Sequence, residues 1–153
     1  MRILLQRVQS ASVTVDDQIV GSIERGYLLF IGVLRGDTET EATWLAEKIT
    51  KLRLFDGEDG KINDRSLVDS KGEALIVSQF TLAGDTAKGN RPDYTAAAAP
   101  AEAKRLYEYF IQTIGSLGVK TATGEFGASM AVELINDGPV TLLLERASTK
   151  QGT

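Results

Sequence analysis

The first two dozen residues alternate between apolar and polar side chains, which is the pattern of strands with one buried face. The alternation over residues 2–15 is imperfect, and its slip near Gln9 and Ser10 indicates a bulge or bend. The pair Asp16–Asp17 predicts a turn after this strand. Residues 18–23 then predict a second strand, so the chain opens with two strands joined by a turn.

Two later segments have the periodicity of amphipathic helices. Thr38, followed three residues later by Glu41, forms a capping-box pattern that predicts the start of the first helix. Pro100 is suited to the first position of the second helix. Their apolar faces are Leu45, Ile49 and Leu52 in the first helix, and Ala103, Leu106, Tyr107, Phe110 and Ile114 in the second.

The remaining apolar runs predict further strands, and the order of elements predicts the fold class. These runs cover residues 27–34, 75–82, 119–123, 128–135 and 140–145. Strands, helix, strand, helix and strands follow one another with no linker and no repeat. We therefore expect a single α/β domain in which two helices pack on one side of a mixed, partly curled or doubled β-sheet. The domain should span residues 1–145, followed by a polar tail over 146–153.

The composition limits the chemistry that this chain can perform. Its 153 residues contain no cysteine and no histidine, so disulfides, thiolate metal sites and imidazole bases are excluded. The acidic cluster Asp56–Gly60 lacks the spacing of a helix-loop-helix calcium site and is interpreted as a solvated turn. We expect no metal and no cofactor. Any catalysis must therefore depend on positioning, main-chain dipoles or the substrate's own groups.

Charge and hydropathy limit the partners and the location of the protein. The formal net charge of −4 argues against a protein that clamps nucleic acid by bulk electrostatics, but not against recognition of an RNA end by a pocket with a local basic patch. The opening apolar run is too short for a signal peptide, and no segment reaches membrane-spanning length. We expect a cytoplasmic protein that does not associate with a membrane.

The first candidate site is the polar end of the predicted strand over residues 75–82. If the chain is extended there, Gln79 and Thr81 emerge on one face, opposite Ser78 and Phe80. This pattern is typical of a strand end whose hydroxyls bond to neighbouring backbone. It is also typical of a pocket floor in which the N–H groups of Phe80 and Thr81 bind a carbonyl oxygen that Gln79 and Thr81 orient.

The second candidate site is the segment Asn136–Thr141, which lies between two strand-forming runs. The Gly138–Pro139 step is ordinarily a turn. A cis bond before proline costs only about 0.5 to 1 kcal/mol and would fold the chain back sharply. Neighbouring carbonyl oxygens could then point the same way and receive an ammonium group.

Three further features are weaker. The loop Lys88–Pro92 could hold a phosphate but lacks the spacing of a phosphate-binding glycine loop. Gly124 and Gly127 do not form a dinucleotide fingerprint, because they follow no strand-then-helix pattern. Arg7, within an apolar strand, is either a structural ion-pair partner or a residue that reaches a site.

The two candidate sites together resemble the signature motifs of the D-aminoacyl-tRNA deacylases, also known as the D-tyrosyl-tRNA deacylase family. These enzymes free tRNA from wrongly attached D-amino acids. The matching motifs are Ser78–Leu82 and Asn136–Thr141, and the likeness extends in the family's order to about Glu145. Supporting segments are Gln6–Val8 with Ala11 and Val13, Lys88–Pro92, Ala96–Pro100 and Phe126–Met130.

The resemblance implies a homodimer that hydrolyses D-aminoacyl-tRNA and spares L-aminoacyl-tRNA. In such a dimer the Gly138–Pro139 bond is cis and enters the active site of the partner subunit. Its carbonyls capture the substrate's α-amino group and leave no room for an L side chain. The segment Ser78–Leu82 receives the terminal adenosine and the ester. The catalytic residues implied are Ser78, Gln79, Phe80 and Thr81, and the substrate-binding residues are Gly138, Pro139, Arg7, Phe126 and Met130.

The residue inventory also bears on the mechanism. Thr81 has no histidine to take its proton, and an unassisted alcohol is a poor nucleophile near neutral pH. We therefore expect water to hydrolyse the ester, assisted by the substrate's free 2′-hydroxyl and by main-chain N–H groups, while Thr81 and Gln79 position the substrate. Two other functions stay open: a non-catalytic dimeric module that binds an RNA end or a small ligand, and a threonine-nucleophile hydrolase acting on free D-amino-acid derivatives.

Overall fold

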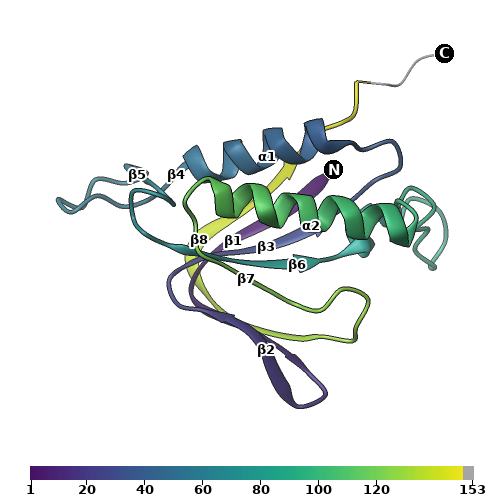
Figure 1. Ribbon diagram of the computed structural model, residues 1–153, viewed down its shortest axis with the longest axis horizontal. Coiled ribbons are helices and arrows are strands. Elements are labelled where there is room, and N and C mark those ends of the chain that lie inside the picture. Colours follow the sequence, from purple (N-terminus) through teal and green to yellow (C-terminus); the bar gives the residue numbers. More distant parts are fainter. Residues whose placement is uncertain (150–153) are drawn as a thin grey trace.

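Strand β1 (Arg2–Val15) is the strand on which the main sheet is built (Figure 1). The computed structural model describes residues 1–149. Three strands run antiparallel to β1: β2 (Gln18–Ile23) along its second half, β3 (Gly26–Gly32) along its first half, and β8 (Ala131–Glu145) along nearly all of it. Strand β6 (Glu73–Ser78) adds to β3 in parallel, and β7 (Thr121–Thr123) adds to β6 in parallel.

The sheet curls until its two ends approach each other. A Cβ atom on Gly21 of β2 would lie 2.1 Å from the carbonyl oxygen of Thr123 in β7, so only glycine permits this approach. The curl encloses a small second core. It is formed by Val8, Ala11, Val13, Ile23, Leu28, Leu75 and Val77.

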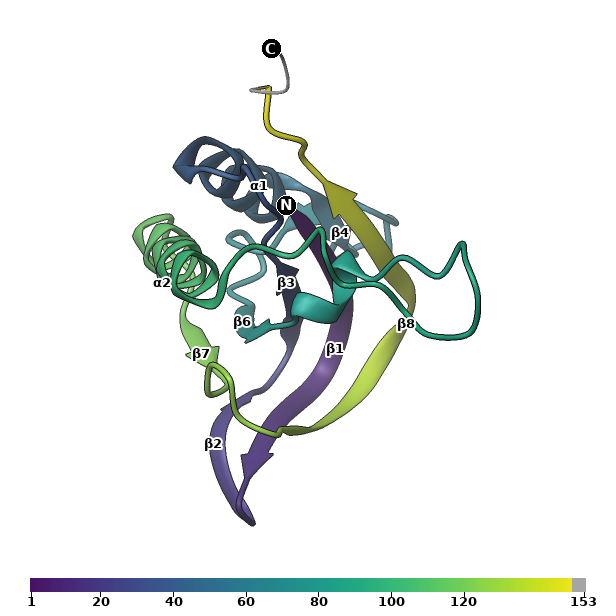
Figure 2. The same cartoon turned by 90° about the vertical axis from the view of Figure 1, so that its right-hand side faces the viewer.

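Helices α1 (Glu39–Lys51) and α2 (Pro100–Ser116) cover the other face of the sheet, side by side (Figures 1 and 2). The capping box forms as predicted, because the backbone N–H of Thr38 donates to the Glu41 carboxylate at 2.6 Å. The hydroxyls of Thr43 and Tyr109 join the two helices at 2.8 Å. The predicted α/β class, with a mixed and partly curled sheet and both helices on one side, is confirmed.

Several predicted boundaries were wrong. The strand predicted over 75–82 ends at Ser78, and Phe80–Ala83 forms a 3₁₀ turn, η1. Residues 53–66, where no strand was predicted, contain a small second sheet of β4 (Arg53–Phe55) and β5 (Arg65–Ser66). The two strands predicted at the end of the chain are one strand, β8, because both halves pair with β1.

The start of the predicted tail is bound to the domain. The backbone N–H of Arg146 donates to the carbonyl of Met1 at 3.0 Å, and the Arg146 guanidinium lies 4.6 Å from the centre of the Trp44 ring. The last four residues of the predicted tail, 150–153, lie outside the described residues. Among residues 1–149, no helix is long and apolar enough to cross a membrane.

Candidate functional site

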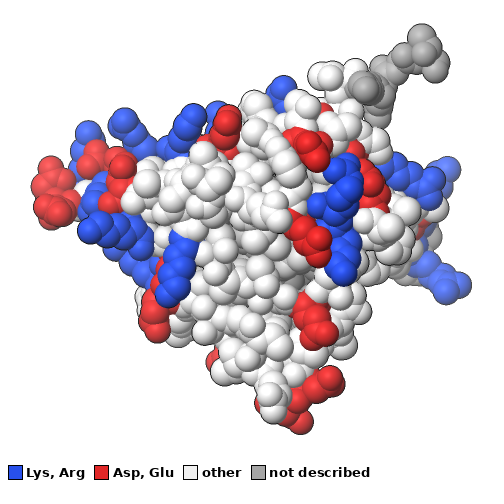
Figure 3. All heavy atoms as spheres, in the orientation of Figure 1, with Lys and Arg blue, Asp and Glu red and all other residues white. Residues whose placement is uncertain are grey.

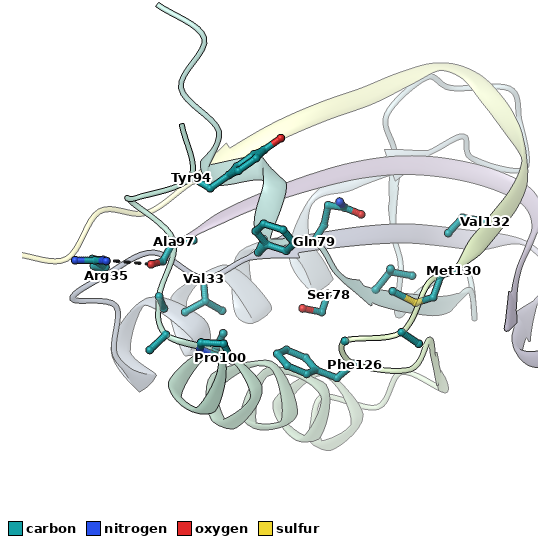
Figure 4. A pocket seen from close by; sticks show the side chains of 17 residues that line it. Val33, Arg35, Ser78, Gln79, Tyr94, Ala97, Pro100, Phe126, Met130 and Val132 are labelled. Carbon is teal, nitrogen blue, oxygen red and sulfur yellow. Dashed lines mark hydrogen bonds between the residues drawn. The ribbon is translucent and has the colours of Figure 1, made fainter. Parts of the chain in front are cut away.

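A cavity with a volume of about 800 Å³ lies where β6 ends and α2 begins. In Figure 4, Arg35 lies at one end, Val132 at the other, and Ser78 and Gln79 between them. Tyr94 and Phe126 lie on opposite sides. The full lining is Val33, Arg35, Val77, Ser78, Gln79, Phe80, Tyr94, Ala97, Ala98, Ala99, Pro100, Ala103, Phe126, Gly127, Ala128, Met130 and Val132.

The floor of the cavity is the junction between β6 and η1. The N–H of Gln79 makes the last bond to β3, donating to the carbonyl of Ile31 at 2.8 Å. The N–H of Leu82 then bonds back to the carbonyl of Gln79 at 3.2 Å and closes the 3₁₀ turn. The N–H groups of Phe80 and Thr81 precede the first bond of that turn. Within residues 1–149 neither donates a hydrogen bond, so both are free to bind an oxygen atom.

The side chains of the floor form a short polar pair. The amide Nε2 of Gln79 donates to the Thr81 hydroxyl. Among residues 1–149, the ionisable side chains on the lining are only those of Arg35 and Tyr94, so this part of the chain places no carboxylate or amine there to accept a proton. The sequence interpretation placed Gln79 and Thr81 on one face of an extended strand. The structure brings the two side chains together through the 3₁₀ turn instead.

The wall opposite Tyr94 is formed by Phe126 and Met130, two of the residues that the resemblance implies bind the substrate. Phe126 packs on Tyr107 of α2, with ring centroids 5.9 Å apart. The Tyr107 hydroxyl donates to the carbonyl of Ile76 in β6 at 2.7 Å, and burial raises its pKa to about 12. The aromatic pair thus fixes the wall to both α2 and the strand that carries the floor.

The rim contains residues that sequence reasoning did not assign to the site. Tyr94 meets Phe80 edge to face at 5.4 Å, and both rings are exposed. Arg35 donates to the carbonyl of Ala97 at 3.3 Å. The only signal in the sequence was the small-residue run from Ala96 to Pro100, whose lack of bulk leaves the cavity open beside the start of α2.

The second predicted motif forms a large bulge in β8. Gln6 pairs with Thr141 and Val8 pairs with Asn136, so the four residues between them lie opposite a single residue of β1, Arg7. The side-chain amide of Asn136 spans the base of this bulge, donating to the carbonyls of Arg7 at 2.9 Å and Val140 at 3.2 Å. The segment does not reverse the chain, as an ordinary Gly-Pro turn would, because both ends remain paired with β1.

The Arg7 side chain binds the residues of the bulge. Its Nε donates to the carbonyl of Asp137 at 3.2 Å and pairs with the Asp137 carboxylate at 3.1 Å. One terminal nitrogen contacts the carbonyl of Gly138 at 3.5 Å, and the other donates to Leu54 at 2.5 Å. Two neighbouring carbonyls therefore do face one cation, but that cation is Arg7 of the same chain.

The predicted site residues thus fall into two groups. Ser78, Gln79, Phe80, Phe126 and Met130 line the cavity, and Thr81 bonds to Gln79. Gly138, Pro139 and Arg7 are absent from the lining and lie together at the bulge. The Gly138–Pro139 bond is cis, and both residues are exposed.

The fold and the cavity define an α/β protein whose candidate active site depends on main-chain groups. The profile of the family described as D-Tyr-tRNA(Tyr) deacylase matches residues 4–145. A D-aminoacyl-tRNA deacylase from Exiguobacterium sp. is 54% identical over 146 residues, covering 95% of this chain and 99% of that protein. Another from Thermomicrobium roseum is 53% identical over 153 residues, covering 100% of this chain and 99% of that protein. The chain therefore belongs to the D-aminoacyl-tRNA deacylase family, as its motifs predicted.

Two solved structures share the fold of this chain. The structure of a "c-Myc DNA Unwinding Element Binding Protein" is 38% identical, has a TM-score of 0.90, and matches 97% of this chain and 100% of its own. A structure described as "a probable eukaryotic D-amino acid tRNA deacylase" has a TM-score of 0.81 over 94% of this chain and 97% of its own. At 20% identity, the second likeness concerns the fold alone.

Proposed function

We propose that this protein hydrolyses the ester bond of D-aminoacyl-tRNA and releases a free D-amino acid and tRNA. The observation that carries the proposal is the floor of the cavity. Two main-chain N–H groups, those of Phe80 and Thr81, are unpaired within residues 1–149 at the edge of a largely apolar pocket. Donors fixed in this way stabilise the oxyanion that forms when an ester carbonyl is attacked. That the bond is the ester of an aminoacyl-tRNA follows from membership of the deacylase family. The enzyme acts where aminoacyl-tRNA is used, in the cytoplasm.

Water is the nucleophile in this mechanism. Its oxygen bonds to the ester carbonyl carbon, and the carbonyl oxygen becomes an anion that accepts hydrogen bonds from the N–H groups of Phe80 and Thr81. The bond to the ribose oxygen then breaks, and the proton lost by water reaches that leaving oxygen by way of the neighbouring ribose hydroxyl. The absence of an acidic or basic side chain other than Arg35 and Tyr94 on the lining supports this assistance by the substrate.

The Gly138–Pro139 bulge completes the cavity of a partner subunit. Its exposure on the surface supports this arrangement. Three exposed apolar side chains of the same strand, Ile135, Leu142 and Leu143, support burial of β8 in a homodimer. A carbonyl oxygen has two lone pairs, so Gly138 can keep its contact with Arg7 and still accept a bond from the substrate's α-amino group.

Chiral selection follows from exclusion by backbone. A bulge held by Arg7 and Asn136 is a rigid wall, and an L side chain directed at it would clash. A D side chain points out of the pocket, so many sizes are accepted. Glycine has no side chain to exclude, and glycyl-tRNA is therefore also a substrate.

The proposed role of the floor can be tested by removing one donor. Phe80→Pro deletes the N–H of Phe80 at the first position of η1, where proline is tolerated. Phe80→Ala is the matched control, because it removes the ring and keeps the N–H. Loss of one oxyanion donor lowers kcat by about 10²- to 10³-fold. We expect this loss in single-turnover deacylation only for Phe80→Pro, and equal rates in the two variants would contradict the proposed floor.

The two alternative functions are separated by substrate. A module that only binds RNA ends would bind D-aminoacyl-tRNA without shortening the lifetime of its ester. A hydrolase of free D-amino-acid derivatives would cleave simple D-aminoacyl esters as readily as D-aminoacyl-tRNA. The proposed enzyme cleaves D-aminoacyl-tRNA, spares L-aminoacyl-tRNA and requires the ribose of the tRNA end.

A further inference from the structure

Backbone hydrogen bonds join the two ends of a loop between η1 and α2. The backbones of Asp85 and Asp93 bond to each other in both directions, at 2.8 and 2.9 Å. We call the enclosed segment, residues 85–93, the basic loop. The chain leaves it directly into Tyr94, whose ring lies on the rim of the cavity. The basic loop is therefore anchored beside the mouth of the cavity.

The charges of the basic loop are separated along its length. The carboxylate of Asp85 accepts from the backbone of Ala87 at 2.9 Å, and that of Asp93 from the backbone of Thr95 at 2.8 Å. Both carboxylates are thus engaged by neighbouring backbone N–H groups. The two cations, Lys88 and Arg91, lie between them in the exposed part of the loop.

Neither cation is used by the fold. Among residues 1–149, the ion pairs and side-chain hydrogen bonds include neither Lys88 nor Arg91. Basic side chains project from the right-hand edge of the molecule in Figure 3, where this loop lies in Figure 1. A third cation, Arg35, lines the cavity itself. A chain with a formal charge of −4 thus presents unpaired positive charge beside its cavity.

We propose that Lys88 and Arg91 bind the phosphodiester backbone of the single-stranded RNA that leads into the cavity. This inference rests on the proposed function, which puts the terminal nucleoside and its ester inside the pocket. The nucleotides before it must leave through the mouth, and their phosphates then pass the basic loop. The two cations bind phosphate without reading bases, so they raise affinity for every tRNA acceptor end.

The size of the effect follows from counterion release. Each phosphate that a protein neutralises on a single strand contributes about 0.7 to the slope of log affinity against log salt concentration. Replacing both cations should therefore reduce that slope by about 1.4. Exposed ion pairs are weak individually, so each single replacement should raise KM by about threefold at low salt.

The experiment compares a substrate with phosphates and a substrate without them. Lys88→Ala, Arg91→Ala and the double variant are assayed on D-aminoacyl-tRNA and on 3′-D-aminoacyl-adenosine, which has no phosphate. Lys51→Ala is the control, since it removes one exposed charge from the far end of α1 (Figure 1). We expect a higher KM and a smaller salt slope on tRNA for the loop variants, with kcat unchanged. On aminoacyl-adenosine all variants should equal the wild type.

Two outcomes overturn the inference. If the loop variants keep the KM and the salt slope of the wild type on tRNA, the cations do not touch the RNA. If the KM of the loop variants rises as much on aminoacyl-adenosine as on tRNA, the loop shapes the cavity instead of binding phosphate. Arg91→Lys, which keeps the charge, should restore most of the affinity that Arg91→Ala loses.

A failure of the proposed function would be distinguishable. If the wild-type protein deacylates neither substrate, binding is measured by fluorescence anisotropy with a labelled RNA that ends in the tRNA acceptor sequence. The slope of log affinity for this RNA against log salt concentration still tests whether Lys88 and Arg91 contact phosphate. Loss of slope in the double variant would then support the RNA contact, and an unchanged slope would refute it.

Discussion

The guanidinium Nε of Arg7 lies 3.1 Å from the carboxylate of Asp137 and 3.2 Å from the carbonyl oxygen of the same residue. This double contact attaches the bulge of β8 to β1 at a position where the two strands do not pair. Arg7 is buried, with 7% of its surface exposed, and its bonds to the bulge and to Leu54 are partly buried. The contact ties the exposed bulge of β8 to the core of the sheet.

Replacing Arg7 should therefore affect both stability and activity. Arg7→Ala leaves the carbonyls of Leu54 and Asp137 without their donor, and breaking such buried charged bonds costs about 3 kcal/mol. Lysine cannot reproduce the several contacts of the planar guanidinium, so Arg7→Lys should regain only part of the loss. Urea unfolding and single-turnover deacylation measure the two effects. Full stability and activity in Arg7→Ala would contradict the role of this clamp.

Thr81→Ala should retain substantial deacylase activity. Its hydroxyl is bonded to the amide of Gln79, and no base lies on the cavity lining to take its proton. Removing a true nucleophile lowers kcat by on the order of 10⁴-fold or more, whereas a positioning residue costs far less. The rate of Thr81→Ala on D-aminoacyl-tRNA decides between them, with Thr81→Ser as the control. An acyl-enzyme trapped on Thr81 would overturn hydrolysis by water.

Activity should require the bulge of the neighbouring subunit. A Cβ on Gly138 would meet only the Asn136 side chain, at 3.6 Å, so Gly138→Ala should fold normally and obstruct the partner's cavity. In a heterodimer of Gly138→Ala with Phe80→Pro, one of the two sites has an intact floor and an intact bulge. Random exchange of equal amounts should therefore restore about a quarter of wild-type activity. If verified exchange restores none, the cross-subunit arrangement is wrong.

Glycyl-tRNA should be cleaved and L-alanyl-tRNA spared, because exclusion acts only on a side chain that clashes with the bulge. Single-turnover deacylation of glycyl, D-alanyl and L-alanyl esters on one tRNA makes the comparison. D-aminoacyl esters with larger side chains should also react, since those side chains point out of the pocket. Glycyl-tRNA as resistant as L-alanyl-tRNA would mean that a D side chain is positively recognised.

The capping box of α1 makes stability depend on pH. Burial raises the pKa of the Glu41 carboxyl, but hydrogen bonds from the hydroxyl and backbone of Thr38 outweigh it and hold the pKa below 4.5. The folded protein therefore binds this proton less readily than the unfolded chain does. The stabilisation is present above pH 4.5 and is lost as the pH falls through the folded pKa.

Glu41→Gln should remove that dependence. It should cost about 1 kcal/mol at pH 7, the usual contribution of a capping interaction, and less below pH 4. Urea unfolding of both proteins at pH 7 and pH 3.5 measures the difference. Glu47→Gln, on the same helix, is the control for loss of one charge. A constant difference between Glu41→Gln and the wild type at the two pH values would contradict this account.

Local patterns in the sequence were sufficient for most elements, because those elements depend on neighbouring residues. The bounds of β1 and β2, the capping box at Thr38 and the start of α2 at Pro100 all agree with the structure. Each follows from alternation, from a side chain that satisfies helix N–H groups, or from the fixed φ of proline. The two motifs that define the family are also contiguous segments of the chain.

Tertiary structure decided where those motifs lie and which of their backbone groups are left unpaired. The pairing of Gln79 with Ile31 ends β6 at Ser78, and the 3₁₀ turn that follows leaves two N–H groups unpaired within the described residues. Propensity alone predicted an extended strand there. Likewise, the bulge exists because β1 pairs with β8 on both sides of Arg7, a residue 130 positions before Asp137. Pairing between distant strands does not appear in any local pattern, since it depends on which chain segments the sheet brings into contact.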